Sequence, residues 1–169
     1  TMDLARNFLD KDENFIIWAA EQTEGRGRYG RKWISPKGGL YFSLIVRKND
    51  ISDFLSEIIT LSLIKTLYDF GIKGCKIDFP NDIIIKGKKI SGVLIERSGD
   101  FYIIGIGINV EKNPNFEKYG YITMEDITGR KIDIKEVLTS FIKNFENTFK
   151  LFKNNIESGL KIWSENLLK

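Results

Sequence analysis

Four short strand-like segments follow one another near the middle of this chain, and they constrain its fold more than any other feature. They span residues 76–79, 83–86, 89–97 and 101–109. The turns between them are Pro80-Asn81-Asp82, Gly87-Lys88 and Ser98-Gly99-Asp100. Such short turns join antiparallel neighbours, because parallel strands need a crossover of a dozen residues or more. The sequence therefore predicts an antiparallel meander.

Further strands and helices are expected on both sides of the meander. Residues 15–20 (FIIWAA) form a continuous apolar run, which indicates a buried strand, and residues 40–47 indicate a second strand. Helices are predicted from the apolar pattern at 2–9, 51–70, 134–153 and 155–168. Residues 110–122 are expected to form a loop. Central strands with helices near the ends predict an α+β fold, with a mixed or antiparallel central sheet and flanking helices.

Length and composition exclude several classes of protein. The 169 residues are expected to form one domain, 1–169. The chain has no histidine, which excludes catalytic triads and zinc sites that depend on that residue. Cys75 is the only cysteine, so no internal disulfide can form, and an unpaired thiol is typical of the cytoplasm. No stretch of ~18 apolar residues that could span a membrane is present.

A loop rich in glycine and arginine is predicted at 21–39. Its segment GRGRYGR at 25–31 matches the dinucleotide fingerprint formally, but that motif needs a helix directly afterwards. The following WISPKGG cannot be helical. Residues 24–37 hold five cations and one carboxylate, a net charge of +4, whereas the whole chain has +3. Arginine forks bind phosphate and glycines allow close approach of the backbone, yet a solvated basic loop fits the composition equally well.

The turn at 79–82 and the strands that follow it carry further candidate residues. Asn81 and Asp82 offer oxygen ligands suited to Mg²⁺, although a simple turn is the alternative. Alternation along the strands predicts two rows that each share one face: Ile90, Gly92 and Leu94, and Gly105 and Gly107. Lys89 lies at the entrance of the first row and Asn109 at the end of the second. Glycines inside strands often mark the close approach of a ligand, but a tightly packed helix would also need them.

Taken together, these motifs resemble the catalytic domain of biotin protein ligases. The matching segments are Thr1-Met2-Asp3, Gln22 with the loop at 25–39, the turn at 79–82, KKISGVLIE at 88–96 and Gly105-x-Gly107-x-Asn109. They occur in the family's order along essentially the whole chain. The resemblance implies a fold related to class II aminoacyl-tRNA synthetases and lipoate ligases. It also implies that biotin and ATP form biotinyl-adenylate, with Mg²⁺, and that biotin then passes to a lysine of a carboxylase's biotin carboxyl carrier domain.

The resemblance further implies a role for each matched residue. Biotin is expected to contact Thr1, Gln22, Gly25, Arg26, Lys89, Ile90, Gly92, Leu94 and Gly105. ATP is expected to contact Arg28, Arg31, Trp33, Asn81 and Asn109. Lys89, Arg28 and Arg31 are the expected catalytic residues, and Asn81 with Asp82 the expected metal ligands. Neither the helix-turn-helix nor the C-terminal β-barrel of some members is matched, so no DNA binding is expected.

Two alternatives remain beside this interpretation. One is a lipoate or octanoate ligase of the same fold. An octanoyltransferase would need a cysteine nucleophile, and Cys75 has no basic partner in its motif, which indicates an inert thiol. The other is a module that binds biotin or nucleotide without transferring anything. An exposed strand edge could also pair two copies into a homodimer.

Overall fold

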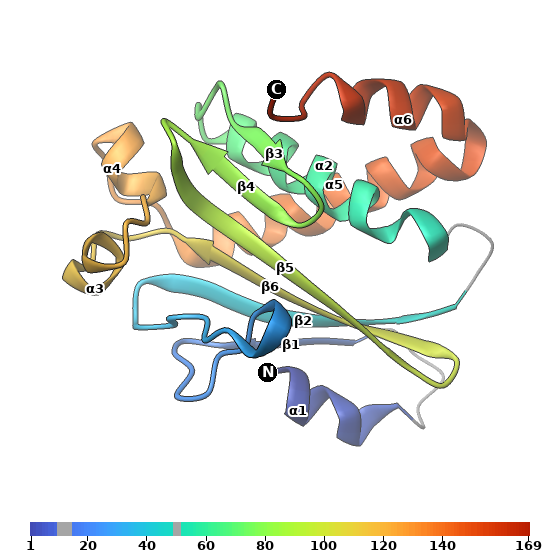
Figure 1. The fold of residues 1–169 in the computed structure, drawn as a ribbon, viewed down its shortest axis with the longest axis horizontal. Coiled ribbons are helices and arrows are strands. Elements are labelled where there is room, and N and C mark those ends of the chain that lie inside the picture. Colours follow the sequence, from blue (N-terminus) through green and yellow to red (C-terminus); the bar gives the residue numbers. More distant parts are fainter. Residues whose placement is uncertain (10–14, 49–51) are drawn as a thin grey trace.

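The computed structural model describes residues 1–9, 15–48 and 52–169, and its centre is a six-stranded antiparallel sheet (Figure 1). The strands are β1 (Phe15–Ala19), β2 (Gly39–Arg47), β3 (Lys76–Asp78), β4 (Asp82–Ile85), β5 (Lys88–Ser98) and β6 (Phe101–Asn109). Their order across the sheet is β1-β2-β6-β5-β4-β3. Because β3 to β6 pair in sequence, the predicted meander is confirmed.

Helices cover both faces of this sheet. Three of them lie on one face: α2 (Leu55–Asp69), α5 (Ile134–Asn154) and α6 (Ile156–Ser164) (Figure 1). The short α1 (Met2–Ala5), continued by a 3-10 turn at Arg6–Phe8, packs on the opposite face. Residue 51, where a helix was expected to begin, lies outside the described residues. No helix in the described part of the chain combines the length and apolarity needed to cross a membrane.

The loop expected at 110–122 contains a helix, so that prediction was partly wrong. The helix is α3 (Pro114–Lys118), and α4 (Met124–Thr128) follows it. Asn113 caps α3 by accepting a hydrogen bond from the backbone N–H of Asn115, and Pro114 occupies the first turn. Both are local signals for the start of a helix, but five residues are too few to show an apolar period.

The main core lies between the sheet and the three helices. Phe42 of β2 meets Phe141 of α5 with ring centres 5.1 Å apart, and both side chains are fully buried. Trp163 of α6 donates a hydrogen bond to Thr60 of α2 at 3.0 Å, which joins these two helices. A smaller cluster, Met2, Ala5, Ile45 and Ile103, holds α1 on the other face. A pocket lies beside this cluster on the same face.

The first strand does not have the burial that its apolar run indicated. β1 lies at the edge of the sheet, and within the described residues it pairs with β2 alone. Ile16 and Trp18 point outward and are 41% and 42% exposed. An apolar run cannot distinguish an edge strand from a central one, because strand order depends on long-range pairing.

A bulge in β5 overturns the expected common face of Ile90, Gly92 and Leu94. Ile83 pairs with Ser91 while Ile84 pairs with Lys89, so Ile90 is the extra residue. An extra residue reverses the alternation of side chains. Ile90 is therefore fully buried in the main core, whereas Lys89 shares the face of Gly92: a Cβ on Gly92 would lie 3.0 Å from the Lys89 Cε.

Candidate functional site

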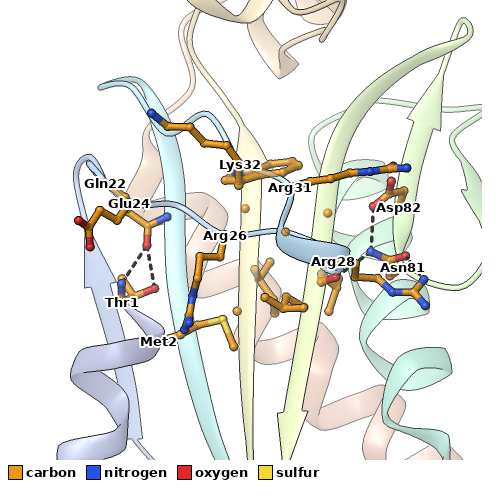
Figure 2. A pocket seen from close by; sticks show the side chains of 18 of the residues that line it. Thr1, Met2, Gln22, Glu24, Arg26, Arg28, Arg31, Lys32, Asn81 and Asp82 are labelled. Atoms are coloured by element: carbon orange, nitrogen blue, oxygen red, sulfur yellow. Dashed lines mark hydrogen bonds between the residues drawn. The ribbon is translucent and has the colours of Figure 1, made fainter.

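A pocket of about 360 Å³ lies on the sheet face that carries α1 (Figure 2). Strands β5 and β6 form its floor, and the arginine loop, which we define as residues 22–35, covers it. Thr1 and Gln22 lie on one side of the pocket, and Arg28, Asn81 and Asp82 lie on the other (Figure 2). The two ends therefore differ in chemistry.

The arginine loop keeps its shape through backbone pairing. Isolated antiparallel bridges join Gln22 to Ser35 and Arg26 to Lys32. The backbone N–H of Trp33 donates to the carbonyl of Gly25 at 2.9 Å. Gly25 itself does not line the pocket: a Cβ there would lie 2.6 Å from the Ser35 Oγ and would also strike the Trp33 carbonyl. Its contribution is to let the two sides of the loop approach each other.

Arg26 fastens the same loop to its surroundings. Its guanidinium pairs with Asp3 of α1 at 2.7 Å and lies 3.8 Å from Glu96 of β5. All three side chains are partly exposed, so the ion pairs themselves contribute little stability. They do place the loop over the end of α1.

A chain of hydrogen bonds forms the polar end of the pocket. Ser43 of β2 donates to the Thr1 hydroxyl at 2.7 Å, and this hydroxyl donates to the Gln22 Oε1 at 3.1 Å. The Gln22 Nε2 donates to the Ser35 Oγ at 3.0 Å, and the Ser35 hydroxyl donates to the Trp33 carbonyl at 3.2 Å. Both serines are buried, and the sequence alone assigned neither of them a role. Ser43 interrupts the apolar strand LYFSLIV, and that interruption is the one signal it offered.

The opposite end of the pocket is cationic. Arg28 donates to the Asn81 Oδ1 at 3.0 Å and to the Tyr29 hydroxyl at 3.1 Å. Asn81 is anchored in turn, because its Nδ2 donates to the carbonyl of Val93 in β5 at 2.8 Å. The Lys89 Nζ forms an ion pair with Asp82 at 2.6 Å. Arg31 lines the pocket on this side and is exposed (Figure 2). Together these cations can receive a polyanion.

Glycines on the floor let large side chains lie against the sheet. Gly105 and Gly107 share one face, as predicted: a Cβ on Gly105 would lie 2.6 Å from the Met2 Sδ, and one on Gly107 would lie 2.6 Å from the Trp33 Cε2. The Trp33 ring stacks on Tyr121 at 5.7 Å, and the Lys89 Nζ lies 4.8 Å from its centre. Within the described residues, the buried Trp33 Nε1 has no hydrogen-bond partner.

The pocket brings together most of the residues that the sequence pointed to. Its lining includes Thr1, Gln22, Arg26, Arg28, Arg31, Trp33, Asn81, Asp82, Lys89, Gly92, Leu94 and Gly105. Ile90 and Gly25 lie outside it for the reasons given above. Asn109 also lies outside it, fully buried, and donates to the carbonyls of Lys89 and Ile122, both at 3.3 Å. The structure therefore places the Asn109 amide behind the backbone of Lys89.

Titratable groups near and away from the pocket differ in their environments. Burial raises the pKa of Tyr121, and the charges of Asp82 and Tyr119 raise it further, so this phenol stays protonated beside Trp33. Cys75 lies in the main core, and burial raises the pKa of its thiol to about 11. A protonated, buried thiol is a poor nucleophile, which agrees with the inert role expected for Cys75.

The residues near Asp82 fit a metal ion only in part. The described residues contain no group of three or more His, Cys, Asp or Glu side chains suited to a metal. Asp82 is paired with Lys89, and the Asn81 Oδ1 accepts from Arg28. Mg²⁺ is usually held by one or two carboxylates together with substrate phosphates. The donor set therefore suits a cation that arrives with a nucleotide, not one held by protein alone.

Comparison with known proteins adds independent observations. Residues 1–113 match the biotin/lipoate A/B protein ligase family. The bifunctional ligase/repressor BirA of Bacillus subtilis is 31% identical over 173 residues, which cover 95% of this chain and 53% of the relative. The chain thus spans about half the length of the curated relatives that it matches.

Solved structures show the same fold. The biotin protein ligase of Leishmania major in complex with biotinyl-5-AMP superimposes with a TM-score of 0.86 and 28% identity, covering 100% of this chain and 79% of that one. The biotin protein ligase of Aquifex aeolicus in complex with biotin and ATP has a TM-score of 0.74 and 34% identity, covering 89% and 67%. The predicted α+β fold, related to class II synthetases, is therefore confirmed.

Proposed function

The chain belongs to the biotin/lipoate A/B protein ligase family, and from that membership we propose that it is an ATP-dependent biotin protein ligase. It joins biotin to ATP as biotinyl-5′-AMP and then transfers biotin to a lysine of a carboxylase's biotin carboxyl carrier domain. One observation supports this best: a single pocket has hydrogen-bonding groups at Thr1 and Gln22, cations at Arg28 and Lys89, and a glycine floor between them.

The first step needs no general base. The carboxyl group of biotin has a pKa of ~4, so it is ionised at pH 7 and can act as the nucleophile directly. A carboxylate oxygen bonds to the α-phosphorus of ATP, and the bond to pyrophosphate breaks. The main obstacle is repulsion between the carboxylate and the polyphosphate, which nearby positive charge must offset. Arg28 and Lys89 supply that charge, and Asn81 holds Arg28 in place beforehand.

Lys89 must exchange partners as the nucleotide binds. In the free protein its ammonium is paired with Asp82. A triphosphate carries more negative charge than one carboxylate and competes for the same ammonium. Mg²⁺, if it accompanies the nucleotide, would be held by Asp82 and phosphate oxygens and would supply additional positive charge there.

The second step needs a neutral amine. The lysine of the carrier domain has an ordinary pKa of ~10.4, and the cations around the pocket lower it because like charges disfavour the protonated form. The amine attacks the carbonyl carbon of biotinyl-5′-AMP, an amide bond forms, and AMP leaves. Asp82 lines the pocket and is the candidate acceptor of the amine proton.

Release of pyrophosphate from ATP tests the proposed function. The purified chain is supplied with ATP, Mg²⁺ and either biotin, lipoate or no acid, and a biotin carrier domain is added in a second reaction. We expect pyrophosphate only with biotin, followed by biotin on one carrier lysine. A mock preparation from host cells that do not express the chain, purified identically, reports any contaminating host ligase. Turnover with lipoate instead, or biotin binding without pyrophosphate release, would overturn the proposal.

A further inference from the structure

We propose that Ser35 is a positioning residue that, together with Thr1, fixes which way the Gln22 side-chain amide points, and so sets the donor and acceptor pattern of the polar end of the pocket. Its relevance to biotin rests on the proposed function, whereas its effect on Gln22 does not. Ser35 is buried, 5% exposed, and lies on the strand-like return of the arginine loop opposite Gln22. Ser35 lies within the loop segment that carries the family resemblance, but the sequence alone assigned it no role.

The Ser35 hydroxyl has a single proton to donate. This proton is used in the hydrogen bond to the Trp33 carbonyl at 3.2 Å. The Ser35 Oγ can then only accept from other groups. The Gln22 amide group therefore has to turn its NH₂ toward Ser35, where the Nε2 lies 3.0 Å from the Oγ. The opposite orientation would set two acceptors against each other.

The other hydrogen bonds at this end of the pocket agree with this orientation of the Gln22 amide. With the NH₂ facing Ser35, the Gln22 Oε1 faces Thr1 and accepts from its backbone nitrogen at 2.9 Å and from its hydroxyl at 3.1 Å. The Thr1 hydroxyl oxygen accepts from Ser43 at 2.7 Å, and its own proton points to Gln22. All donors thus run in one direction, from Ser43 through Thr1 and Gln22 to Ser35 and the Trp33 carbonyl.

Backbone contacts hold Ser35 firmly beside Gln22. Its backbone carbonyl accepts from the Gln22 N–H at 3.0 Å, so the two residues are joined at the main chain as well as at the side chains. A Cβ on Gly25 would lie 2.6 Å from the Ser35 Oγ, which shows how closely the opposite side of the loop covers this hydroxyl. A replacement at Ser35 therefore leaves the Gln22 Nε2 without its acceptor, and the amide is then held from the Thr1 side alone.

A fixed amide matters for a ligand with both donors and an acceptor on one edge. The cyclic urea of biotin has two N–H groups and one carbonyl. A reversed Gln22 amide would place a donor opposite a donor, or an acceptor opposite an acceptor. A dithiolane or an alkyl chain has neither kind of group and gains nothing from the orientation. Ser35 is thus expected to act on the affinity for ureas while leaving the affinity for ATP almost unchanged.

A double-mutant cycle tests the link between Ser35 and Gln22 in the full 169-residue chain. We expect Ser35→Ala to raise the Kd for biotin about tenfold, because a partly buried amide donor loses its partner. Desthiobiotin, which keeps the urea, should lose as much. In a Gln22→Met background, the same Ser35→Ala change should alter the Kd for biotin less than twofold. The KM for ATP should change less than twofold in both backgrounds.

Ser62→Ala is the matched control. Ser62 is another fully buried serine whose hydroxyl donates to a backbone carbonyl, that of Ile58 at 2.6 Å, and it lies in α2, outside the pocket lining. Loss of this hydroxyl should leave biotin binding unchanged. Additive effects of Ser35→Ala and Gln22→Met on biotin binding, or equal losses for biotin and ATP, would overturn the proposal.

A second measurement needs no ligand. The side-chain NH₂ protons of Gln22 are identified by NMR as the pair missing in Gln22→Met. In Ser35→Ala we expect the hydrogen-bonded proton of this pair to shift upfield and to exchange faster with water; unchanged signals would overturn the proposal. If these signals respond while the wild type fails to bind biotin, the positioning role stands and the proposed function fails.

Discussion

The ammonium of Lys89 lies 2.6 Å from the carboxylate of Asp82, so the free protein neutralises the cation that faces the glycine floor. Both side chains are only 25% exposed. In this position Lys89 can move from Asp82 to an incoming phosphate without leaving the pocket. The bulge at Ile90 makes this possible, because it turns Lys89 onto the pocket face.

Lys89→Met should abolish adenylate formation. Without the ammonium, nothing on this part of the floor offsets the repulsion between carboxylate and phosphate, and we expect kcat/KM for pyrophosphate release to fall by a factor of about 10² or more. Lys88→Met is the control, since Lys88 is an exposed neighbour in the same strand and lies outside the pocket lining. Adenylate formation within tenfold of wild type would contradict the assigned role of Lys89.

Asp82→Asn should separate the two chemical steps. If the carboxylate accepts the amine proton, transfer from preformed biotinyl-5′-AMP to a carrier domain should slow by about tenfold or more. Single-turnover transfer, in which adenylate formation plays no part, measures this directly. Transfer at the full rate would show that Asp82 is not the proton acceptor, whatever its effect on the first step.

Arg28→Gly should weaken retention of the adenylate. The guanidinium bridges the arginine loop to Asn81, and its loss removes both a phosphate contact and that tether. Biotinyl-5′-AMP should then escape and acylate lysines on unrelated proteins. Mass spectrometry of a bystander such as serum albumin would count such lysines, and a bystander as clean as with the wild-type chain would refute the prediction.

Gly107→Ala should displace Trp33. An added Cβ would lie 2.6 Å from the Trp33 Cε2, and the Trp33 backbone is held by Gly25, so the ring must move. We expect a changed indole N–H signal for Trp33 by NMR and a KM for ATP raised about tenfold. Ile104→Val, in the main core on the opposite face of the same strand and outside the pocket lining, should leave that signal in place while lowering stability by about 1 kcal/mol. An unmoved Trp33 signal in Gly107→Ala would be inconsistent with the packing described.

These sites show what the sequence could and could not predict. Local signals were sufficient to predict the meander, because turn residues such as Asn81-Asp82 and Gly87 determine the backbone conformation of their immediate neighbours. They were sufficient for the cationic loop, because its charge is concentrated in one stretch. The sheet face on which Ile90 lies could not be predicted in this way, because a bulge depends on the register with another strand. Ser35 needed the fold as well, because its partner Gln22 lies 13 residues away.

Glu57→Gln should stabilise the protein at neutral pH. Glu57 lies in the first turn of α2, its Oε2 is buried, and among the described residues that oxygen has no hydrogen-bond partner. Burial raises the pKa of this carboxyl, partly offset by a backbone hydrogen bond. A raised pKa means that the folded state binds the proton more tightly than the unfolded chain, whose Glu has a pKa of ~4.3. The stabilising contribution of the protonated carboxyl is therefore complete below that value and lost as the pH rises through the folded-state pKa.

The glutamine variant lacks this loss. Its free energy of unfolding, measured with urea, should exceed that of the wild type by an amount that grows between pH 4 and pH 7. Glu146→Gln, at an exposed position of α5, controls for the change in net charge. If the difference between Glu57→Gln and wild type stayed constant over this range, burial of Glu57 would not shift its titration, and the carboxyl would have to be solvated in solution.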